Sequence, residues 1–319
     1  MELKEISLEI IRKCPNNCVH CSSNSSMNCN EIISFDKFVE IIDEALILGL
    51  KTICFSGGEP FIHPEFVKML EYVALKELNI YVYTSGIYTA YGKIGSIPIS
   101  ILECIKDKVT KLIFNIEASC ESTYDSIMGT KGYFKYLKKS VCDANRLGIL
   151  TEAHFVPMKL NIDEIESTIQ MCQQLGISKI SFLRLVNHGR AEFNKSKVIL
   201  TDDEIENIKI QLKKISLKNN NINIRIGIPL SGNDCKNRCE AAYGKLNIKY
   251  DGGVYPCEVF KNNKVQIFDK CKADNVYLRN LKDIYLNSTY LCAIRKCVER
   301  FSHEYECENC VGQYYIKNI

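Results

Sequence analysis

Short segments in which apolar and polar residues alternate recur along the first part of the chain, with amphipathic helical segments between them. In the first of these segments Ile6, Leu8 and Ile10 share one face, which is the period-two pattern of a β-strand. The spacing of apolar residues then predicts a helix over 35–48, with Gly49 as its stop signal. Strands that alternate with helices in this way are typical of a parallel sheet covered by helices.

The pattern predicts six strand–helix units, fewer than the eight of a closed TIM barrel. We therefore expect the α/β class, with a partial (β/α)6 TIM-like barrel over residues 1–230 whose open side leaves a lateral mouth for a bulky substrate. The expected strands are 6–10, 52–55, 80–84, 111–116, 150–156 and 180–185, with a further one at 222–228. The expected helices are 35–48, 64–75, 134–147, 162–175 and 202–217.

The composition of the sequence changes after residue 230, where cysteines become frequent. The stretch LNIKYDGGVYPC has the pattern of a hairpin with Asp-Gly at its turn. Such a segment is too short to form a core of its own, so we expect a small metal-stapled domain over residues 231–319. Its cysteines are Cys235, Cys239, Cys257, Cys271, Cys292, Cys297, Cys307 and Cys310.

Cysteine is the unusual component of an otherwise ordinary globular composition, with 17 residues among 319. The first ten residues carry charges from Glu2 onward and contain no apolar signal segment, so we expect a cytoplasmic protein in a reducing compartment. There, cysteines serve metal or redox chemistry more often than disulfides. The net charge is +3 without a block of basic residues, and no apolar run is long enough to span a membrane. Neither nucleic acid nor a membrane is therefore expected as a partner.

Cys14, Cys18 and Cys21 form a C-x3-C-x2-C motif that follows directly on the first strand. Three thiolates from one compact loop can ligate three irons of a cubane cluster. The fourth iron would keep an open site, as catalytic metals do, where a cofactor or substrate binds. In so cysteine-rich a chain this spacing can also arise by chance. Its position at the carboxyl end of a strand, where βα folds place their chemistry, favours the cluster.

A second motif, Ser56-Gly57-Gly58-Glu59-Pro60, follows the second strand. Together the two motifs resemble the radical S-adenosylmethionine (SAM) superfamily, in which C-x3-C-x2-C follows the first barrel strand and Gly-Gly-Glu-Pro the second. The resemblance implies that the three cysteines hold a 4Fe-4S cluster and that Gly57, Gly58, Glu59 and Pro60 hold the methionine amino group of SAM. It also implies reductive cleavage of SAM to a 5′-deoxyadenosyl radical that abstracts a hydrogen atom from a substrate.

Three polar residues further along match the family more weakly. Asn115 and Glu117, at the end of the fourth expected strand, lie where the family contacts the ribose of SAM. Arg184, after the sixth, would pair with the SAM carboxylate. The alternative for each is an ordinary polar residue at a strand end.

The C-terminal cysteines resemble the auxiliary-cluster appendages called SPASM and twitch. The spacing from Cys239 to Cys257 and the pair Cys307-x2-Cys310 imply four ligands for one second 4Fe-4S cluster rather than two further clusters. Zinc bound by the same four thiolates is the alternative. Cys235 is either an extra ligand or, as in radical SAM epimerases, a thiol that donates a hydrogen atom to a substrate radical; plain packing is the third interpretation.

The resemblance implies an enzyme that modifies a peptide, such as a ribosomally made natural-product precursor, by epimerisation, oxidation or cross-linking. It implies an external electron donor such as flavodoxin or ferredoxin. One alternative is a small-molecule dehydrogenase or epimerase of the aminosugar type, because the C-x17-C…C-x2-C spacing also resembles that small twitch class. A non-enzymatic zinc or iron–sulfur scaffold or sensor is the alternative from another class, and the SAM-binding turn speaks against it.

Overall fold

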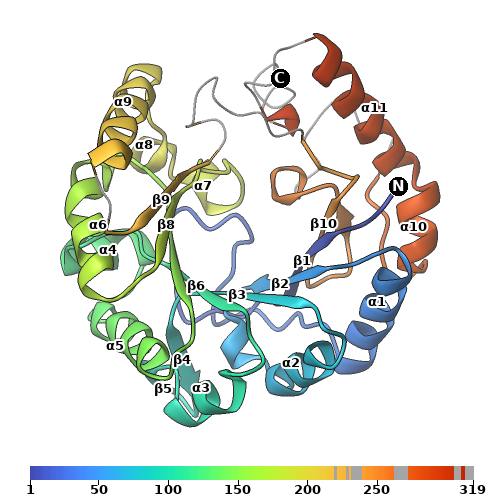
Figure 1. The fold of residues 1–319 in the computed structure, drawn as a ribbon, viewed down its shortest axis with the longest axis horizontal. Helices are drawn as coiled ribbons and strands as arrows, with labels where there is room; N and C mark the ends of the chain where they lie inside the picture. The colour runs from blue at the N-terminus through green and yellow to red at the C-terminus, as the bar shows by residue number, and fades with distance from the viewer. Residues whose placement is uncertain (219–220, 228–229, 231–238, 262–271, 305–309, 313–319) are drawn as a thin grey trace.

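The computed structural model describes residues 1–218, 221–227, 230, 239–261, 272–304 and 310–312. Within this part of the chain, nine strands form one curved sheet in the order β11-β10-β1-β2-β3-β6-β7-β8-β9. Helices cover the outside of the curve (Figure 1). This is the predicted partial barrel.

The barrel strands pair in parallel, and their bounds agree closely with the sequence pattern. They are β1 (Glu5–Ile11), β2 (Thr52–Gly57), β3 (Asn79–Thr84), β6 (Lys111–Asn115), β7 (Thr151–Phe155), β8 (Lys179–Phe182) and β9 (Asn223–Ile226). The helices of this region are α1 (Phe35–Ile47), α2 (Phe66–Ala74), α3 (Ile99–Ile105), α4 (Glu121–Met128), α5 (Phe134–Arg146), α6 (Ile165–Gln174), α7 (Arg190–Phe193), α8 (Lys195–Val198) and α9 (Asp202–Lys218). A small antiparallel hairpin, β4 (Ile87–Ala90) and β5 (Lys93–Ser96), was not predicted, and neither were the helices α3, α4, α7 and α8.

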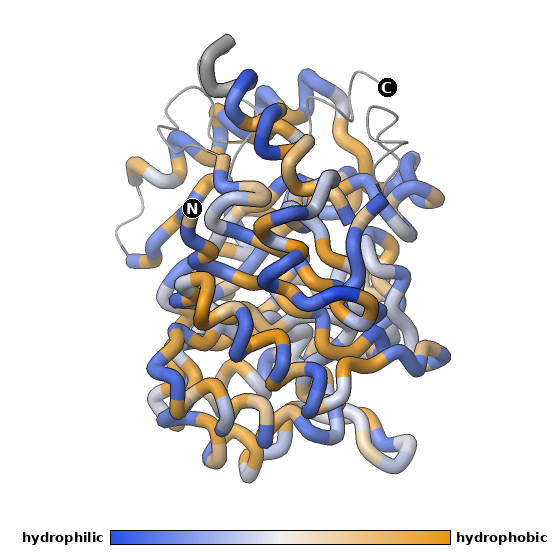
Figure 2. Tube along the Cα trace, turned by 90° about the vertical axis from the view of Figure 1, so that its right-hand side faces the viewer, coloured by the Kyte–Doolittle hydropathy of each residue, from blue (hydrophilic) through white to orange (hydrophobic). Residues whose placement is uncertain are grey.

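The core lies between the outer face of the sheet and the helices. Alternation sends Leu8 of β1 and Phe55 of β2 outward, and both are fully buried. Phe38 of α1 stacks on Phe55 with ring centroids 5.6 Å apart, and Phe66 of α2 meets Phe55 edge-on at 5.5 Å. These aromatic contacts fix the first two helices against the sheet. Figure 2 shows hydrophobic and hydrophilic residues alternating along the helices, as this two-sided environment requires.

The other face of the strands points into the barrel and is largely polar. On β1, Ser7 and Glu9 occupy the positions between the outward-facing apolar residues. At one place in the interior the Nζ of Lys111 lies 2.9 Å from a carboxylate oxygen of Glu152. Polar and charged side chains at these positions can orient a ligand inside the barrel.

The C-terminal segment continues the sheet of the barrel. β10 (Lys245–Ile248) pairs in parallel with β1, and β11 (Val254–Tyr255) returns antiparallel to β10. The hairpin predicted for LNIKYDGGVYPC is thus confirmed, with Gly252 at a φ of 83° in its turn. Two helices follow, α10 (Leu281–Asn287) and α11 (Thr289–Glu304), which were not predicted. No helix within the described part of the chain is both long and apolar enough to cross a membrane.

Because the hairpin and the barrel share one sheet, we expect them to unfold together. Ile248 of β10 is fully buried, so Ile248→Ala should lower the free energy of unfolding by about 2–5 kcal/mol. The loss should shift a single denaturation transition of the whole chain, measured by urea titration with circular dichroism. Leu278→Ala, at an 89% exposed position, is the control and should change little. A separate transition that alone responds to Ile248→Ala would contradict the shared sheet.

Candidate functional site

A cavity of about 580 Å³ lies inside the barrel, and it includes the carboxyl ends of several strands. Both predicted groups of site residues reach it: the N-terminal cysteines with the glycine turn, and one cysteine of the C-terminal segment. The predicted site residues that line it are Cys14, Cys18, Cys21, Gly57, Gly58, Asn115, Arg184 and Cys257.

The loop that carries the first three cysteines is held from two sides. From α4, the carbonyl of Met128 accepts a hydrogen bond from the backbone N–H of Asn17 at 2.9 Å. From the turn after β8, Arg190 donates its backbone N–H to the carbonyl of Cys21 at 2.9 Å and its Nε to that of Cys18 at 2.6 Å. These contacts hold the backbone of the loop that carries the three thiols.

The chemistry of these side chains suits an iron–sulfur cluster. Burial, with neighbouring thiols adding to it, raises the pKa of Cys14 well above its ordinary value, and burial raises that of Cys18 as well. Such thiols are neutral until metal replaces their protons. Between them Asn16 is 1% exposed and lines the cavity, yet neither atom of its amide has a partner. A buried amide left unsatisfied in this way indicates that a bound group supplies the missing contacts.

Cys14, Cys18 and Cys21 do not converge as the ligands of a single metal ion would. Among the residues that the structure describes, no three His, Cys, Asp or Glu side chains converge closely enough to hold one metal ion. A 4Fe-4S cluster instead takes one thiolate at each iron, so its ligands stand further apart. Cys14, Cys18 and Cys21 around one cavity fit that arrangement.

The Gly57–Gly58 turn packs backbone against backbone on the start of the cysteine loop. The N–H of Gly58 donates to the carbonyl of Ile11 at 2.6 Å, and the N–H of Glu59 donates to that of Lys13 at 2.9 Å. Gly57 has a φ of 132°, and a Cβ on Gly58 would lie 1.9 Å from the carbonyl oxygen of Lys13. Both positions therefore require glycine.

Glu59 lies behind the turn, not among the residues that line the cavity. Its side chain is fully buried, and its carboxylate accepts hydrogen bonds from Thr84 Oγ1 at 2.7 Å and from the N–H and Oγ of Ser85 at 2.8 and 2.6 Å. Pro60, also buried, begins a short 3-10 turn. The carboxylate thus fixes the turn to the end of β3. A direct contact between Glu59 or Pro60 and a cofactor stays a prediction.

Asn115 lines the cavity at the end of β6, whereas Glu117 is fully buried behind it. A carboxylate oxygen of Glu117 accepts from the N–H of Val156 at 2.8 Å, and burial raises the pKa of Glu117 to about 8. His20 Nε2 lies 3.6 Å from the other oxygen, and burial lowers the pKa of His20 to about 4. Burial thus favours the neutral form of both groups and weakens any ion pair between them. That Asn115 and Glu117 contact SAM stays a prediction.

Arg184 faces the C-terminal cysteines. Its guanidinium hydrogen-bonds Cys310 and lies near Cys257, while its Nη1 has no partner. Burial lowers the pKa of Arg184, and the two thiols oppose that effect. The structure thus gives Arg184 a neighbour that the sequence did not suggest, and the pairing with a SAM carboxylate stays a prediction.

Three of the four predicted ligands of the second cluster come together. Cys257 lines the cavity, and Cys310 and Cys239 are close enough to raise its pKa, in addition to the larger effect of burial. Cys307 and Cys235 lie outside the described residues, so their roles stay predictions.

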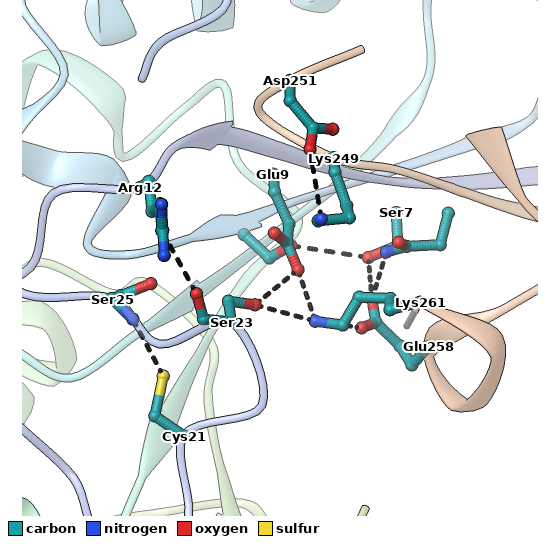
Figure 3. Close-up of polar contacts among 12 residues, drawn as sticks. Ser7, Glu9, Arg12, Cys21, Ser23, Ser25, Lys249, Asp251, Glu258 and Lys261 are labelled. Atoms are coloured by element: carbon teal, nitrogen blue, oxygen red, sulfur yellow. Dashed lines mark hydrogen bonds and ion pairs between the residues drawn. The ribbon is translucent and has the colours of Figure 1, made fainter. Parts of the chain in front are cut away.

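One set of residues at the cavity was missed by the sequence analysis. Lys261, only 5% exposed, forms ion pairs with Glu9 of β1 and with Glu258, which follows Cys257 (Figure 3). Ser23, from the loop after the first cysteines, donates to Glu9 at 2.9 Å. The alternation within β1 could have placed Glu9 inside the barrel. No local pattern indicates that Lys261 meets it from 252 residues away.

Comparisons with known proteins agree with this architecture. A family model described as the radical SAM superfamily matches residues 8–172, just over half of the chain. A second, the SPASM iron–sulfur cluster-binding domain, matches residues 239–311. The chain therefore belongs to the radical SAM superfamily, within its SPASM subgroup. SAM and 4Fe-4S clusters are the cofactors that these two families define.

Relatives of known annotation are distant. The antilisterial bacteriocin subtilosin biosynthesis protein AlbA of Bacillus subtilis is 26% identical over 80% of this chain and 54% of its own length. The PqqA peptide cyclase of Ruegeria pomeroyi is 24% identical over 82% of this chain and 69% of its own. This chain thus spans about half the length of AlbA.

Solved structures share the fold. SuiB of Streptococcus suis, bound to its precursor peptide SuiA, superposes with a TM-score of 0.74 at 16% identity, over 93% of this chain and 69% of SuiB. The SAM-bound enzyme anSMEcpe superposes with a TM-score of 0.69 at 14% identity, over 93% of this chain and 81% of that one.

Because the added Cβ would collide with backbone, Gly58→Ala should displace the turn from the cysteine loop. We expect the affinity for SAM to fall by about tenfold or more, measured by anaerobic equilibrium dialysis of the iron-loaded protein. Gly95→Ala is the control, because no atom lies within 4 Å of a Cβ added there. Equal SAM affinities for the two variants would contradict the role of this close approach.

Proposed function

We propose that this chain is a radical SAM enzyme that modifies a peptide, and that its reaction begins with abstraction of a hydrogen atom. The observation that supports this most strongly is the shared cavity. Cys14, Cys18 and Cys21 line it together with Cys257, so a substrate in the cavity would lie near both proposed metal centres.

In this proposal the first three cysteines hold the reactive 4Fe-4S cluster, and its fourth iron is open to SAM. When bound and reduced, this cluster and SAM supply a 5′-deoxyadenosyl radical. The backbone of Gly57–Pro60 would hold the methionine amino group, with Asn115 near the ribose. Arg190 and Met128 would be positioning residues, because their hydrogen bonds hold the cysteine loop in place.

The second cluster would be held by Cys239, Cys257, Cys307 and Cys310. Full ligation by four thiolates favours electron transfer over direct binding of a substrate at iron. Arg184, which hydrogen-bonds Cys310, would stabilise negative charge on that thiolate. Flavodoxin or ferredoxin would supply electrons. Cys235 would be a hydrogen-atom donor or an additional ligand, and residues 1–230 and 231–319 would be the two functional domains.

Several relatives support a peptide as the substrate. AlbA acts in subtilosin biosynthesis, the cyclase acts on the PqqA peptide, and SuiB binds the precursor peptide SuiA. A side chain of the peptide would enter the same cavity of about 580 Å³ in which SAM would bind. Epimerisation, oxidation and cross-linking all begin from the radical that hydrogen abstraction leaves. A small aminosugar-type substrate is the second candidate, favoured by the C-x17-C…C-x2-C spacing of the cysteines.

The proposal requires that the reduced protein convert SAM to 5′-deoxyadenosine. Under anaerobic conditions with dithionite we expect the wild-type protein to form this product, measured by liquid chromatography with mass spectrometry. Cys14→Ala should reduce it to the level of a protein-free control, because one iron loses its ligand.

Cys142→Ala is the matched control, since that thiol is exposed and remote from the lining of the cavity, and it should keep wild-type activity. Wild-type protein that carries zinc and forms no 5′-deoxyadenosine would refute the proposed function.

A further inference from the structure

A buried polar network forms one wall of the cavity, where β1, β10 and the segment after Cys257 meet (Figure 3). We call it the β1–β10 wall. Its members come from two stretches that are far apart in the sequence, 7–23 and 247–261, and none of them has a part in the function proposed above. They are Ser7, Glu9, Ser23, Asn247, Glu258 and Lys261.

Lys261, the cation of this wall, uses all three of its N–H bonds within the wall. An ammonium group has three N–H bonds, and those of Lys261 reach Glu9 Oε1, Ser23 Oγ at 3.0 Å and Glu258 Oε2 at 2.8 Å. Ser23 in turn donates to Glu9 Oε1 at 2.9 Å, and Ser7 donates to Glu258 Oε1 at 2.9 Å. Lys261 therefore has no proton left for a ligand.

Two acceptors of the wall have no partner. The amide nitrogen of Asn247 donates to Glu258 Oε1, and a carboxylate can only accept. The orientation of the amide is thereby fixed, and its Oδ1 points away from Glu258 without a partner. Glu9 Oε2 is also unpartnered, because both of its bonded neighbours use Oε1. Asn247 is fully buried and Glu9 is 2% exposed; both residues line the cavity, and the two oxygens themselves lie just beneath its surface, closed to solvent.

These two oxygens belong to adjacent strands and to the same face of the sheet. Asn247 lies opposite Ser7 in the parallel register, and Glu9 follows Ser7 by two residues on β1. A buried acceptor without a donor is costly, so the wall is complete only when a ligand supplies N–H or O–H groups. Unpartnered acceptors alone, with no unpartnered donor in the wall, exclude a carboxylate or phosphate as that ligand.

The net charge of the wall restricts the chemical class of the ligand further. Glu9 and Glu258 carry two negative charges against one positive charge on Lys261. A cation that offers hydrogen bonds satisfies both needs. Mg²⁺ and Ca²⁺ fit less well, since the described residues contain no group of three or more His, Cys, Asp or Glu side chains that could hold such an ion.

We propose that Glu9 and Asn247 bind a primary ammonium group of the substrate, either a lysine side chain or the N-terminal amine of a peptide. This rests on the proposed function only in placing the substrate in the cavity. The ammonium donates to Glu9 Oε2 and Asn247 Oδ1, and it brings the residue that carries it to the β1–β10 wall. The wall is then a specificity determinant, distinct from the groups that hold the metal or SAM.

The test compares two peptides of equal length on the cluster-loaded enzyme with SAM bound. The probes are Gly-Lys-Gly amide and the same peptide acetylated at both amines, and their affinities are measured by anaerobic isothermal titration calorimetry. For the wild-type enzyme we expect the free-amine peptide to bind about tenfold tighter or more, because a charge-assisted bond is lost on acetylation. Glu9→Gln should abolish this preference.

Glu31→Gln is the control for loss of a carboxylate, because Glu31 pairs with Arg12 outside the cavity, and it should keep the preference. If Glu9→Gln fails to fold, the two peptides on the wild-type enzyme still decide. Equal affinity or no binding of the free-amine peptide overturns the proposal, and so does a preference that Glu9→Gln leaves intact.

Two further outcomes are informative. If Glu9→Gln weakens SAM binding instead, these oxygens serve the amino group of SAM and the proposal is wrong. Formation of 5′-deoxyadenosine by the same preparation is measured in parallel. Its presence without an amine preference overturns this inference alone, and its absence overturns the proposed function.

Discussion

The pairing of β1 with strands on both of its sides is the constraint on which the rest of the structure depends. β1 joins β2 along one edge and β10 along the other, and it runs directly into the loop with Cys14, Cys18 and Cys21. β11 runs back antiparallel to β10, and the segment that follows it, with Cys257, returns along the cavity to Glu9 and Ser23 through Lys261. Two cysteine groups more than 200 residues apart therefore line one cavity.

Close backbone packing and buried charge make this arrangement rigid. The Gly57–Gly58 turn lies against the start of the cysteine loop with no space for a side chain, and Lys261 ties Glu9 of β1 to Glu258. A buried ion pair is a modest source of stability, but removal of one partner is costly. Its main effect here is to fix where the C-terminal segment sits on the barrel.

The unsatisfied polar atoms of the described chain are informative because several of them gather in one place. Asn16 beside the first cysteines, Arg184 beside the C-terminal ones, and the acceptors of the β1–β10 wall all line the same cavity. Native structures satisfy nearly all buried polar groups, so such a concentration marks where ligands complete the site.

Much of the fold and of the site could be predicted from the sequence. Period-two alternation located the barrel strands, and the local spacing of Cys14, Cys18, Cys21 and the Gly57–Gly58 turn located the lining of the cavity. Side-chain direction could not be predicted in the same way. The carboxylate of Glu59 accepts hydrogen bonds from Thr84 and Ser85 behind the turn. These contacts depend on where the end of β3 lies in space, which no local pattern in the sequence indicates.

Contacts between residues that are far apart in the sequence could not be predicted either. Nothing local in the sequence joins Lys261 to Glu9, or Arg184 to Cys310, because those contacts follow from the register of β10 on β1 and from the turn after β8. The hairpin of β4 and β5 was missed because its short strands, IYTA and KIGS, carry only a weak apolar alternation.

The most direct test of two metal centres on one cavity is the iron content of anaerobically reconstituted protein. We expect about eight irons per chain in the wild type and about four in the Cys14→Ala, Cys18→Ala, Cys21→Ala triple variant, since each 4Fe-4S cluster holds four. Electron paramagnetic resonance of the reduced triple variant should show one remaining cluster. Iron near zero in that variant, or a wild type that holds only four irons, would contradict the presence of a second cluster.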